Sequence, residues 1–333
     1  MSEDRFPAPP PGRQGWPWTE GEPVTALARR DPDSWPRLTV ITPSYNQGPF
    51  IEETIRSVLL QGYPNLEYVV IDGGSTDETL GIIRKYSRWL SYWVSEPDRG
   101  QAHAINKGLA RTTGVAVNWI NSDDVLLPNA LGDLADAFGG ARDTIVAGDV
   151  VNFWDGTERE ERVIQRNIAL RPLVEYWSGA ATWHQPGIFL PAKLFAVTGP
   201  LDEDLQYLFD YDLLCRAVRV APVRYLAQPL VRFRLHQRSK SMTVGHRFVL
   251  EAFTISQRYW SSIPAADVTA YRRKFASLIL RVGVRQFRYS PRQALALIRE
   301  ALRVDVVGAV LETARHVPRW LARRSVVVNQ PRA

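Results

Sequence analysis

Two adjacent carboxylates, Asp123 and Asp124, follow an apolar run at residues 115–120 and come directly after Asn121 and Ser122. A run of that length predicts a buried strand of an α/β sheet. Open sheets of this class bind ligands beyond the carboxyl ends of their strands. Paired carboxylates at that edge can hold a divalent cation, and the cation can hold a diphosphate. The alternative is a solvated turn that caps the next helix.

A second acid, Asp72, ends the apolar run at residues 69–71 and precedes Gly73 and Gly74. Two glycines let the backbone turn sharply and approach a ligand closely. At the edge of a sheet, the Asp72 carboxylate can accept the imide N–H of uracil or thymine, or bond a ribose hydroxyl. An Asp-Gly turn without any ligand is the alternative.

The elements that must position these acids alternate along the chain. Apolar runs predict strands at residues 38–41, 68–71, 92–94 and 115–120. Helical spacing predicts helices at residues 51–59, 77–86 and 102–110. Farther on, the patterns predict a helix at residues 128–138 and strands at residues 144–147 and 150–154. The alternation predicts an α/β fold with a mainly parallel sheet flanked by helices.

Charge is distributed unevenly over the 333 residues, whose formal net charge is +6. Residues 250–333 carry fifteen Lys/Arg and five Asp/Glu, so residues 1–249 have a balance of −4. A mildly acidic body argues against a nucleic-acid partner. One cysteine, Cys215, suits a reducing compartment, and the amino terminus lacks the apolar core of a signal peptide. These features predict a cytoplasmic protein.

Several motifs together resemble family 2 glycosyltransferases in their order and approximate spacing. They are the segments at residues 42–46 (TPSYN), 72–77 (DGGSTD), 96–101 (EPDRGQ), 106–108 (NKG) and 121–124 (NSDD). The resemblance covers roughly residues 38–240 and implies the A-type nucleotide-diphospho-sugar transferase fold. With the composition and charge of the two ends, it divides the chain into an irregular arm at 1–37, a glycosyltransferase domain at 38–245 and a basic helical extension at 246–333. Within the domain, it implies a nucleotide-binding half at 38–127 and an acceptor half at 128–245.

The resemblance also implies roles for single residues of the nucleotide-binding half. Thr42 and Asp72 resemble residues that hold the base, and Asp98 and Arg99 match a motif near the base and ribose. The full set of nucleotide-binding candidates is Thr42, Pro43, Tyr45, Asn46, Asp72, Asp98, Arg99, Asn106 and Asp123.

A metal site is implied by the family's Asp-x-Asp motif, whose closing acid matches Asp124. Ser122 stands where many members have the first Asp, which removes one carboxylate. His236 is the candidate that completes the site, because a neutral imidazole can bind Mg²⁺ or Mn²⁺ alongside carboxylates. Ser239 and Lys240 are candidates for binding phosphate oxygens. A solvated basic loop is the alternative for this segment.

In the acceptor half, Asp210 resembles the acid that the family uses as catalytic base at a helix start. Inverting sugar transfer needs one base for the acceptor proton and one Lewis acid for the leaving diphosphate. A helix-capping carboxylate is the alternative for Asp210. His184 and Gln185 are candidates for contact with the acceptor or the diphosphate, and for His184 the alternative is a structural role.

The predicted function is inverting transfer of a sugar from a nucleotide-diphospho-sugar of UDP, dTDP or GDP type to a hydroxyl of a glycan or lipid-linked acceptor. Such transfer would serve assembly of a cell-surface polysaccharide or glycolipid. A catalytically inactive module that binds sugar nucleotide or glycan is the alternative, supported by Ser122 alone. A nucleotidyltransferase on a similar sheet is a weaker alternative, because the residues at 43–48 lack the glycine density of its phosphate loop.

The basic extension contains an apolar stripe flanked by arginines. The stripe is Leu295, Ile298 and Leu302, and the arginines are Arg292, Arg299 and Arg303. A helix of this kind can lie on an anionic membrane, here the inner face, or it can pack against the domain or in a homodimer.

Overall fold

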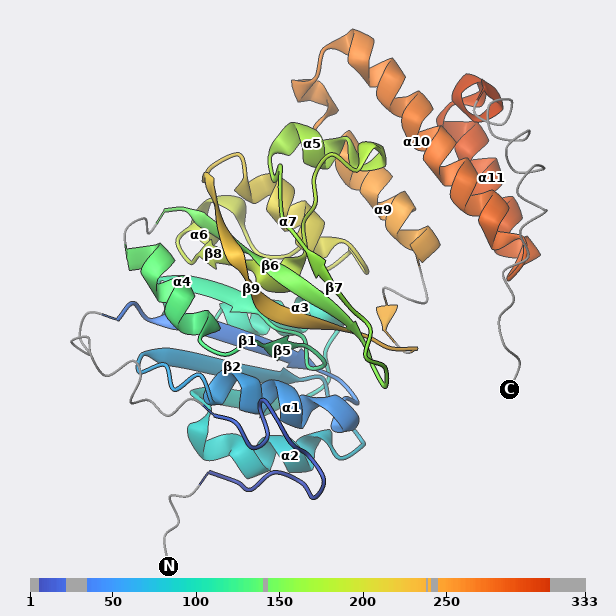
Figure 1. Cartoon of the computed structure of the whole chain (residues 1–333). Coiled ribbons are helices and arrows are strands. Elements are labelled where there is room, and N and C mark those ends of the chain that lie inside the picture. Colours follow the sequence, from blue (N-terminus) through green and yellow to red (C-terminus); the bar gives the residue numbers. More distant parts are fainter. Residues whose placement is uncertain (1–5, 22–34, 140–142, 238, 241–244, 312–333) are drawn as a thin grey trace, which may run out of the picture. The chain divides into compact units, whose positions relative to one another are not determined.

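A mixed sheet of nine strands, counted over the described residues, forms the centre of the larger of two compact units (Figure 1). The structure is a computed structural model that describes residues 6–21, 35–139, 143–237, 239–240 and 245–311. The larger unit comprises Met1–Leu173 and Ala180–Thr243. The smaller unit comprises Val174–Gly179 and Val244–Ala333.

The first half of the sheet is parallel, as predicted. Its strands run in the order β3-β2-β1-β4 and are β1 (Leu38–Ser44), β2 (Leu66–Asp72), β3 (Tyr92–Ser95) and β4 (Ala116–Trp119). The helices between them are α1 (Gly48–Leu59), α2 (Thr79–Tyr86) and α3 (Gln101–Leu109), with the short 3-10 turn η3 (Ser87–Trp89) after α2. All seven residues of β1 are buried, because helices cover both faces of a parallel sheet.

The two faces of β1 can be assigned from single contacts. Val40 belongs to one buried cluster with Ile51 and Ile55 of α1. Ile41 lies on the opposite face, where its Cγ2 would come within 2.6 Å of a Cβ added at Gly108 of α3. Figure 1 shows α1 and α2 on the same side of these strands. The carboxyl ends of β1, β2 and β4 are therefore left as the open edge between the helix layers.

The second half of the sheet mixes both directions. Its strands are β5 (Val125–Leu126), β6 (Ile145–Trp154), β7 (Glu160–Val163), β8 (Ile188–Pro191) and β9 (Val223–Leu235). β8 is antiparallel to β4 and β6, β9 is parallel to β6, and β5 and β7 pair antiparallel with β9 and β6. The remaining elements are α4 (Ala130–Gly139), α5 (Leu170–Val174), η5 (Gln185–Gly187), α6 (Leu194–Thr198) and α7 (Phe209–Ala217). The two strands predicted at residues 144–147 and 150–154 are one strand, whose register shifts at Gly148 and Asp149.

The N-terminal arm is fixed by the guanidinium of Arg56, whose residue is only 3% exposed. Its Nε donates to the Pro17 carbonyl at 3.0 Å and its Nη2 to the Trp18 carbonyl at 3.0 Å. Its Nη1 donates to the Pro7 carbonyl at 2.8 Å and to the Tyr86 hydroxyl at 3.0 Å. The rigid fork of one arginine thus satisfies three carbonyls of the arm. Residues 22–34 of the arm lie outside the described residues.

The smaller unit is helical. It contains η4 (Tyr176–Ser178), α9 (Gly245–Gln257), η6 (Trp260–Ser262), α10 (Ala265–Gln286) and α11 (Pro291–Val304). Pro264 is the N-cap residue of α10, and Pro291 is the first residue of α11. No helix in the described part of the chain is long and apolar enough to span a bilayer.

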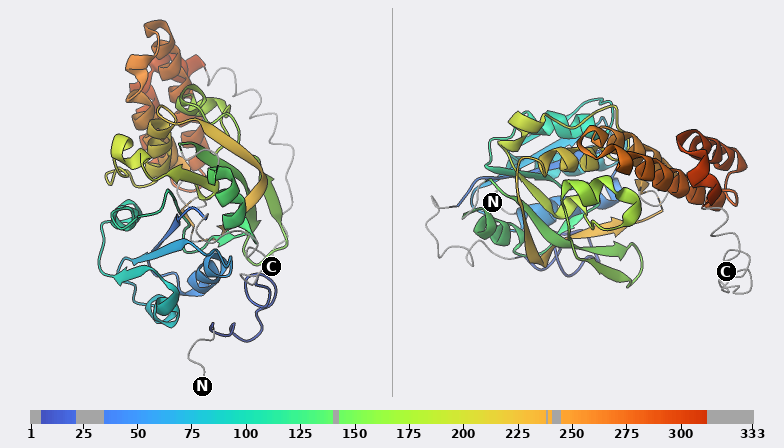
Figure 2. Two further views of the ribbon diagram at one scale, coloured as in Figure 1. Left: turned by 90° about the vertical axis from the view of Figure 1, so that its left-hand side faces the viewer. Right: turned by 90° about the horizontal axis from the view of Figure 1, so that it is seen from above.

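Helices α10 and α11 form an antiparallel pair, which lies side by side in both views of Figure 2. A Cβ added at Gly283 would lie 3.0 Å from Cβ of Leu297, so this glycine permits close contact between the two helices. Gly308, in the helical segment that follows α11, permits a similar approach to α10, because a Cβ added there would lie 2.7 Å from Cα of Arg273. Ser290 caps α11 by accepting the Gln293 N–H at 3.5 Å.

We expect Arg56→Met to lower the free energy of unfolding by about 3 kcal/mol, because the buried carbonyls of the arm lose their donors. Urea denaturation measures the change. Arg84→Met, on the exposed face of α2, is the control and should change stability by about 0.5 kcal/mol or less. Equal stabilities of the two variants would show that the arm is not fixed in this way.

Candidate active site

Asp72 ends β2 and is fully buried. Its Oδ2 accepts the Gly74 and Ser75 N–H groups at 3.2 and 2.9 Å and the Ser95 hydroxyl at 2.6 Å. Its Oδ1 accepts the Ser75 hydroxyl at 2.5 Å. Both oxygens are therefore engaged by the protein, and the carboxylate fixes the turn that follows β2.

The end of β1 joins this turn through Asn46, which has a φ of 52°. Its backbone N–H donates to the Ser75 hydroxyl at 2.7 Å, and its Oδ1 accepts the Thr76 N–H at 2.9 Å. Tyr45 beside it is 60% exposed and free to cover a ligand. Asn46 and Tyr45, both predicted from sequence, thus lie together at the open edge with Asp72.

Thr42 and Pro43 lie inside the sheet instead. The Thr42 hydroxyl is 3.0 Å from the Tyr68 hydroxyl, and both residues are fully buried, so the Thr42 side chain is engaged in the core. Pro43 is buried as well. The residue that follows, Ser44, was not among the predicted site residues. Its Oγ is buried and has no hydrogen-bond partner among the described residues, which makes it a candidate donor to a ligand at this edge.

Asp98 lies against the turn after β2, because a Cβ added at Gly73 would come within 2.5 Å of its Oδ2. Its Oδ1 accepts the Gly100 N–H at 2.7 Å. The structure thus brings Asp98 beside the Asp72 turn. Only glycine at position 73 leaves room for this approach.

Arg99 and Asn106 both bind Glu203, which belongs to the segment before α7. Arg99 forms an ion pair with Glu203, and Asn106 Nδ2 donates to Glu203 Oε1 at 2.9 Å. Asn106 also donates to the Leu201 carbonyl at 3.0 Å and accepts the Leu201 N–H at 2.9 Å. The hydrogen bond from Asn106 and the charge of Arg99 hold the pKa of Glu203 below its usual range. These two predicted nucleotide contacts therefore connect the two halves of the domain.

Asp124 is fully buried at the turn after β4. Its Oδ1 accepts the Arg234 N–H at 3.1 Å and its Oδ2 accepts the Asn121 Nδ2 at 3.1 Å. Its carbonyl accepts the Thr54 hydroxyl of α1 at 2.7 Å. Burial, and secondly the charge of Asp123, raises the pKa of Asp124 well above its usual value. The structure therefore gives Asp124 the surroundings of a structural acid.

The Arg234 side chain, only 6% exposed, holds this turn in place. Its Nε donates to the Asp123 carbonyl at 2.9 Å. Its Nη2 donates to Glu53 Oε2 of α1 at 2.7 Å, and its Nη1 donates to Asp155 Oδ1 after β6 at 2.5 Å. We did not predict a role for Arg234, and no local signal links it to acids 181 and 79 positions away.

His236 pairs with Asp123 and not with Asp124. Its Nε2 lies 3.0 Å from Asp123 Oδ2, and its ring packs on Phe50 with centroids 4.7 Å apart. Neighbouring ligands of an octahedral Mg²⁺ at about 2.1 Å stand about 3 Å apart, so these two atoms fit one divalent cation. Over the described ranges, no group of three His, Cys, Asp or Glu side chains could hold a metal ion. Any cation here would take its other ligands from water or substrate oxygens.

Lys240 and Ser239 follow this histidine. Lys240 Nζ donates to Gln101 Oε1 at 3.0 Å, and Gln101 Nε2 donates to Asn121 Oδ1 at 2.7 Å. The Ser239 hydroxyl donates to the His236 carbonyl at 2.8 Å. Lys240 is exposed, and through Gln101 its positive charge is linked to the turn at residues 121–124.

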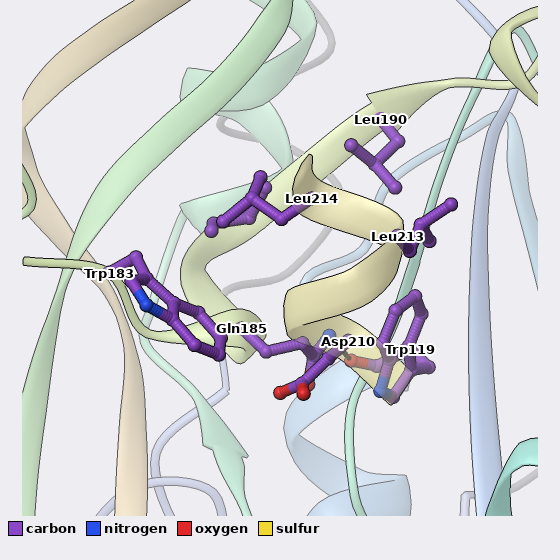
Figure 3. A pocket seen from close by; sticks show the side chains of 8 residues that line it. Trp119, Trp183, Gln185, Leu190, Asp210, Leu213 and Leu214 are labelled. Carbon is purple, nitrogen blue, oxygen red and sulfur yellow. Dashed lines mark hydrogen bonds between the residues drawn. The ribbon is translucent and has the colours of Figure 1, made fainter. Parts of the chain in front are cut away.

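Asp210 lies in the first turn of α7 and lines a small pocket (Figure 3). Its Oδ1 accepts the Tyr211 N–H at 2.8 Å. In Figure 3 the Asp210 carboxylate lies beside Gln185, with Trp119 and Trp183 on either side. Trp119 is the last residue of β4, so the end of this strand both lines the pocket and leads into the turn that carries Asp123 and Asp124.

Gln185 forms a wall of the pocket and is buried. Its Nε2 donates to Asn118 Oδ1 at 2.8 Å and to the Trp119 carbonyl at 2.9 Å. In return, Asn118 Nδ2 donates to the Pro186 carbonyl at 2.7 Å. Gln185, which was predicted to contact the acceptor or the diphosphate, thus joins η5 to the end of β4 and lines the pocket.

His184 packs edge-on against Phe233, with centroids 4.7 Å apart. Burial lowers the pKa of His184 to about 4, so the imidazole is neutral near pH 7. Its Nδ1 is a buried atom without a hydrogen-bond partner among the described residues. Asn152 of β6 is the register partner of Phe233. Its Oδ1 is also buried and has no hydrogen-bond partner among the described residues. Asn152 was missed because a lone Asn in a strand gives no signal in the sequence.

Several known proteins resemble this chain in sequence. The sequence model described as Glycosyl transferase family 2 matches residues 39–192. An uncharacterized glycosyltransferase of Mycobacterium tuberculosis is 30% identical over 193 residues, which are 56% of this chain and 71% of that protein. Bacillus subtilis TuaG, whose name proposes a role in teichuronic acid biosynthesis, is 40% identical over 92 residues, covering 27% of this chain and 36% of that protein.

Among solved structures, S. aureus TarS 1–349 in complex with UDP-GlcNAc has a TM-score of 0.59 at 18% identity. The match covers 84% of this chain and 87% of that chain, and at this identity it shows the fold alone. The chain spans only 36% of the length of two Rickettsia relatives to which it is 28% identical.

The pKa of His184 predicts a pH dependence of stability. The unfolded chain takes up a proton near pH 6.5, whereas the folded chain does so only near pH 4. Acid therefore favours the unfolded state, and the contribution of this group is full above pH 6.5 and is lost as the pH falls to 4. Over this window, the free energy of unfolding should fall by about 3 kcal/mol more in the wild type than in His184→Gln. Urea denaturation at each pH measures these free energies. The same pH dependence in the wild type and in His184→Gln would contradict the lowered pKa of His184.

Proposed function

The chain belongs to glycosyl transferase family 2, and from this premise we propose that it transfers a sugar from a nucleotide-diphospho-sugar to a hydroxyl group of an acceptor. The observation that carries the proposal is the position of Asp210 in a pocket that Trp119 also lines, since Trp119 ends β4 two residues before the turn at residues 121–124. A base in this pocket and a leaving group at this turn would then meet at the end of the same strand. We propose a donor of UDP, dTDP or GDP type, since the TarS fold neighbour was solved with UDP-GlcNAc.

We propose the following division of the chain. Residues 38–127 hold the nucleotide, residues 128–245 hold the acceptor, residues 1–37 form an arm and residues 246–333 form the basic extension. The contacts of Asn46 and Asp98 with the Asp72 turn, and the exposed ring of Tyr45 next to Asn46, support the nucleotide half, since an exposed ring and a tight turn suit a base and a ribose.

For the transfer step, we propose that Asp210 removes the proton of the acceptor hydroxyl. The hydroxyl oxygen then forms a bond to the anomeric carbon, while the bond between that carbon and the diphosphate oxygen breaks and the diphosphate leaves with the electron pair. A single displacement of this kind inverts the anomeric configuration. Lys240 and the hydrogen-bonded turn at residues 121–124 would face the leaving charge.

The Asp123 and His236 side chains fit a divalent cation, and we propose that they hold Mg²⁺ or Mn²⁺ together with donor phosphate oxygens. When bound, such a cation supplies Lewis-acid stabilisation of the diphosphate. Asp124 would act on this site by fixing the turn. The family motif implies that Asp124 is a metal ligand, whereas we propose a structural role. The burial of its carboxyl and its two hydrogen bonds support the structural role.

The acceptor is proposed to be a glycan or lipid-linked sugar of a cell-surface polysaccharide, as the name of TuaG suggests for that relative. The neutral His184 and the Asn152 amide oxygen support a site for hydroxyl groups, because each offers a buried polar atom that has no hydrogen-bond partner in the described part of the chain. We further propose that the enzyme works in the cytoplasm at the inner face of the membrane.

Asp210→Asn should lower the rate of transfer by about 100- to 10,000-fold, the usual contribution of a general base, while leaving donor binding unchanged. Transfer from a panel of UDP-, dTDP- and GDP-sugars measures the rate, and titration calorimetry with the nucleotide measures binding. Asp204→Asn, an exposed acid before α7, is the control. Full activity of Asp210→Asn would reject the base, and binding without transfer by the wild type would favour an inactive module.

Removing the cation with a chelator should weaken UDP binding by about tenfold, or about 1.4 kcal/mol, because the diphosphate loses its counter-charge. Asp123→Asn and His236→Gln should each abolish this difference. Asp124→Asn separates the two assignments, provided circular dichroism shows that the variant folds. If it alone removes the effect of Mn²⁺, Asp124 is the ligand and the proposed pair is wrong.

A further inference from the structure

We propose that the end of the α10–α11 pair is a docking surface for an anionic lipid bilayer. This surface, the hairpin tip, consists of Val284, Arg285, Phe287, Arg288, Tyr289, Arg292 and Leu295. Its use in bringing the enzyme to a lipid-linked acceptor rests on the proposed function, but its binding of lipid does not.

The hairpin tip exposes large apolar side chains. Tyr289 is 83% exposed, Leu295 is 55% exposed, and Val284 and Phe287 are each 42% exposed. They are not the core of the helix pair, which consists of residues such as Ile279, Leu297 and Ala301. The pair therefore has a buried apolar face and, at one end, a second apolar surface that it does not cover itself.

The same end is strongly basic. Residues 268–299 contain eight Lys/Arg and no Asp/Glu. Within the tip, Arg285, Arg288 and Arg292 are exposed, and no ion pair found over the described residues involves them. The nearest acids in sequence, Asp267 and Glu300, lie outside this span.

Antiparallel packing gathers these residues at one end. Gly283 of α10 faces Leu297 of α11, so Val284 and Leu295 lie within about one turn of the connection at residues 287–290. Phe287 and Tyr289 are part of that connection. The three arginines are spaced through the same stretch, so that every apolar residue of the tip has a positive neighbour.

This combination of side chains binds favourably to the surface of an anionic bilayer. Aromatic and aliphatic groups enter the boundary between headgroups and acyl chains, while arginine stems extend so that their charges reach anionic headgroups. A nucleic acid would attract the arginines but would give no comparable gain for exposed Val284 and Leu295. The observed mixture therefore favours lipid over nucleic acid.

The test is co-sedimentation of the full chain with vesicles of phosphatidylcholine alone or mixed with phosphatidylglycerol. The wild type should bind the anionic vesicles at least tenfold more tightly than the neutral ones. The triple variant Arg285→Gln, Arg288→Gln, Arg292→Gln should lose about 100-fold in affinity, since each basic residue near an anionic surface contributes about a factor of five. The double variant Phe287→Ser, Tyr289→Ser should lose binding with its charge unchanged.

Matched controls carry the same chemical changes elsewhere. Arg84→Gln, Arg88→Gln, Arg111→Gln removes three exposed arginines of the larger unit, and Val197→Ser, Val220→Ser removes two exposed apolar residues. Both should bind anionic vesicles as the wild type does. All variants should retain transfer to a soluble acceptor, so loss of vesicle binding and failure of the transfer proposal are distinguishable.

Three outcomes would overturn the docking surface. One is equal sedimentation of the wild type with neutral and anionic vesicles. Another is wild-type binding by the double aromatic variant together with tight binding of single-stranded RNA, which would indicate a polyanion site. The third is an absence of vesicle binding with a concentration-dependent dimer that the aromatic variant abolishes in sedimentation velocity, which would assign the surface to a second copy of the chain.

Discussion

The buried guanidinium of Arg234 is the interaction on which the arrangement of the candidate site depends. An arginine in the interior must be paired, because an uncompensated buried charge is strongly unfavourable. Here the partners are Glu53 on α1, Asp155 after β6 and the carbonyl of Asp123. The backbone of the same arginine holds the carboxyl of Asp124. One residue of β9 thereby fixes a helix, a strand end and the turn after β4 relative to one another.

This constraint gives two adjacent acids different surroundings. The carboxyl of Asp124 is directed inward, where burial and the neighbouring charge disfavour its ionised form. Asp123 is directed toward His236 instead. Identical side chains thus acquire different chemistry from their surroundings alone, as catalytic carboxylate pairs commonly do. A sequence motif alone does not show this difference, because the difference depends on which of the two acids faces the core.

The parallel half of the sheet could be predicted from the sequence because each strand is a short apolar run that ends at a polar turn. The mixed half was harder. Gly148 and Asp149 suggest a break between two strands, but the pairing with β9 bridges them with a register shift. At the site, the sequence located Asp72 correctly at a strand end but could not show that its oxygens are engaged by its own turn. Arg234 and Asn152 could not be found, because their surroundings come from residues far away along the chain.

The contact between Arg99 and Glu203 has a thermodynamic consequence. The arginine side chain is 70% exposed, and ion pairs at such positions contribute little to stability, so exchanging Glu203 for an incoming anion has a small free-energy cost. Asn106 keeps the segment attached after such an exchange. That segment leads into the helix of Asp210. If a donor draws Arg99 away, the helix start that carries the proposed base responds to donor occupancy, and linkage requires that acceptor binding alters donor affinity by the same factor.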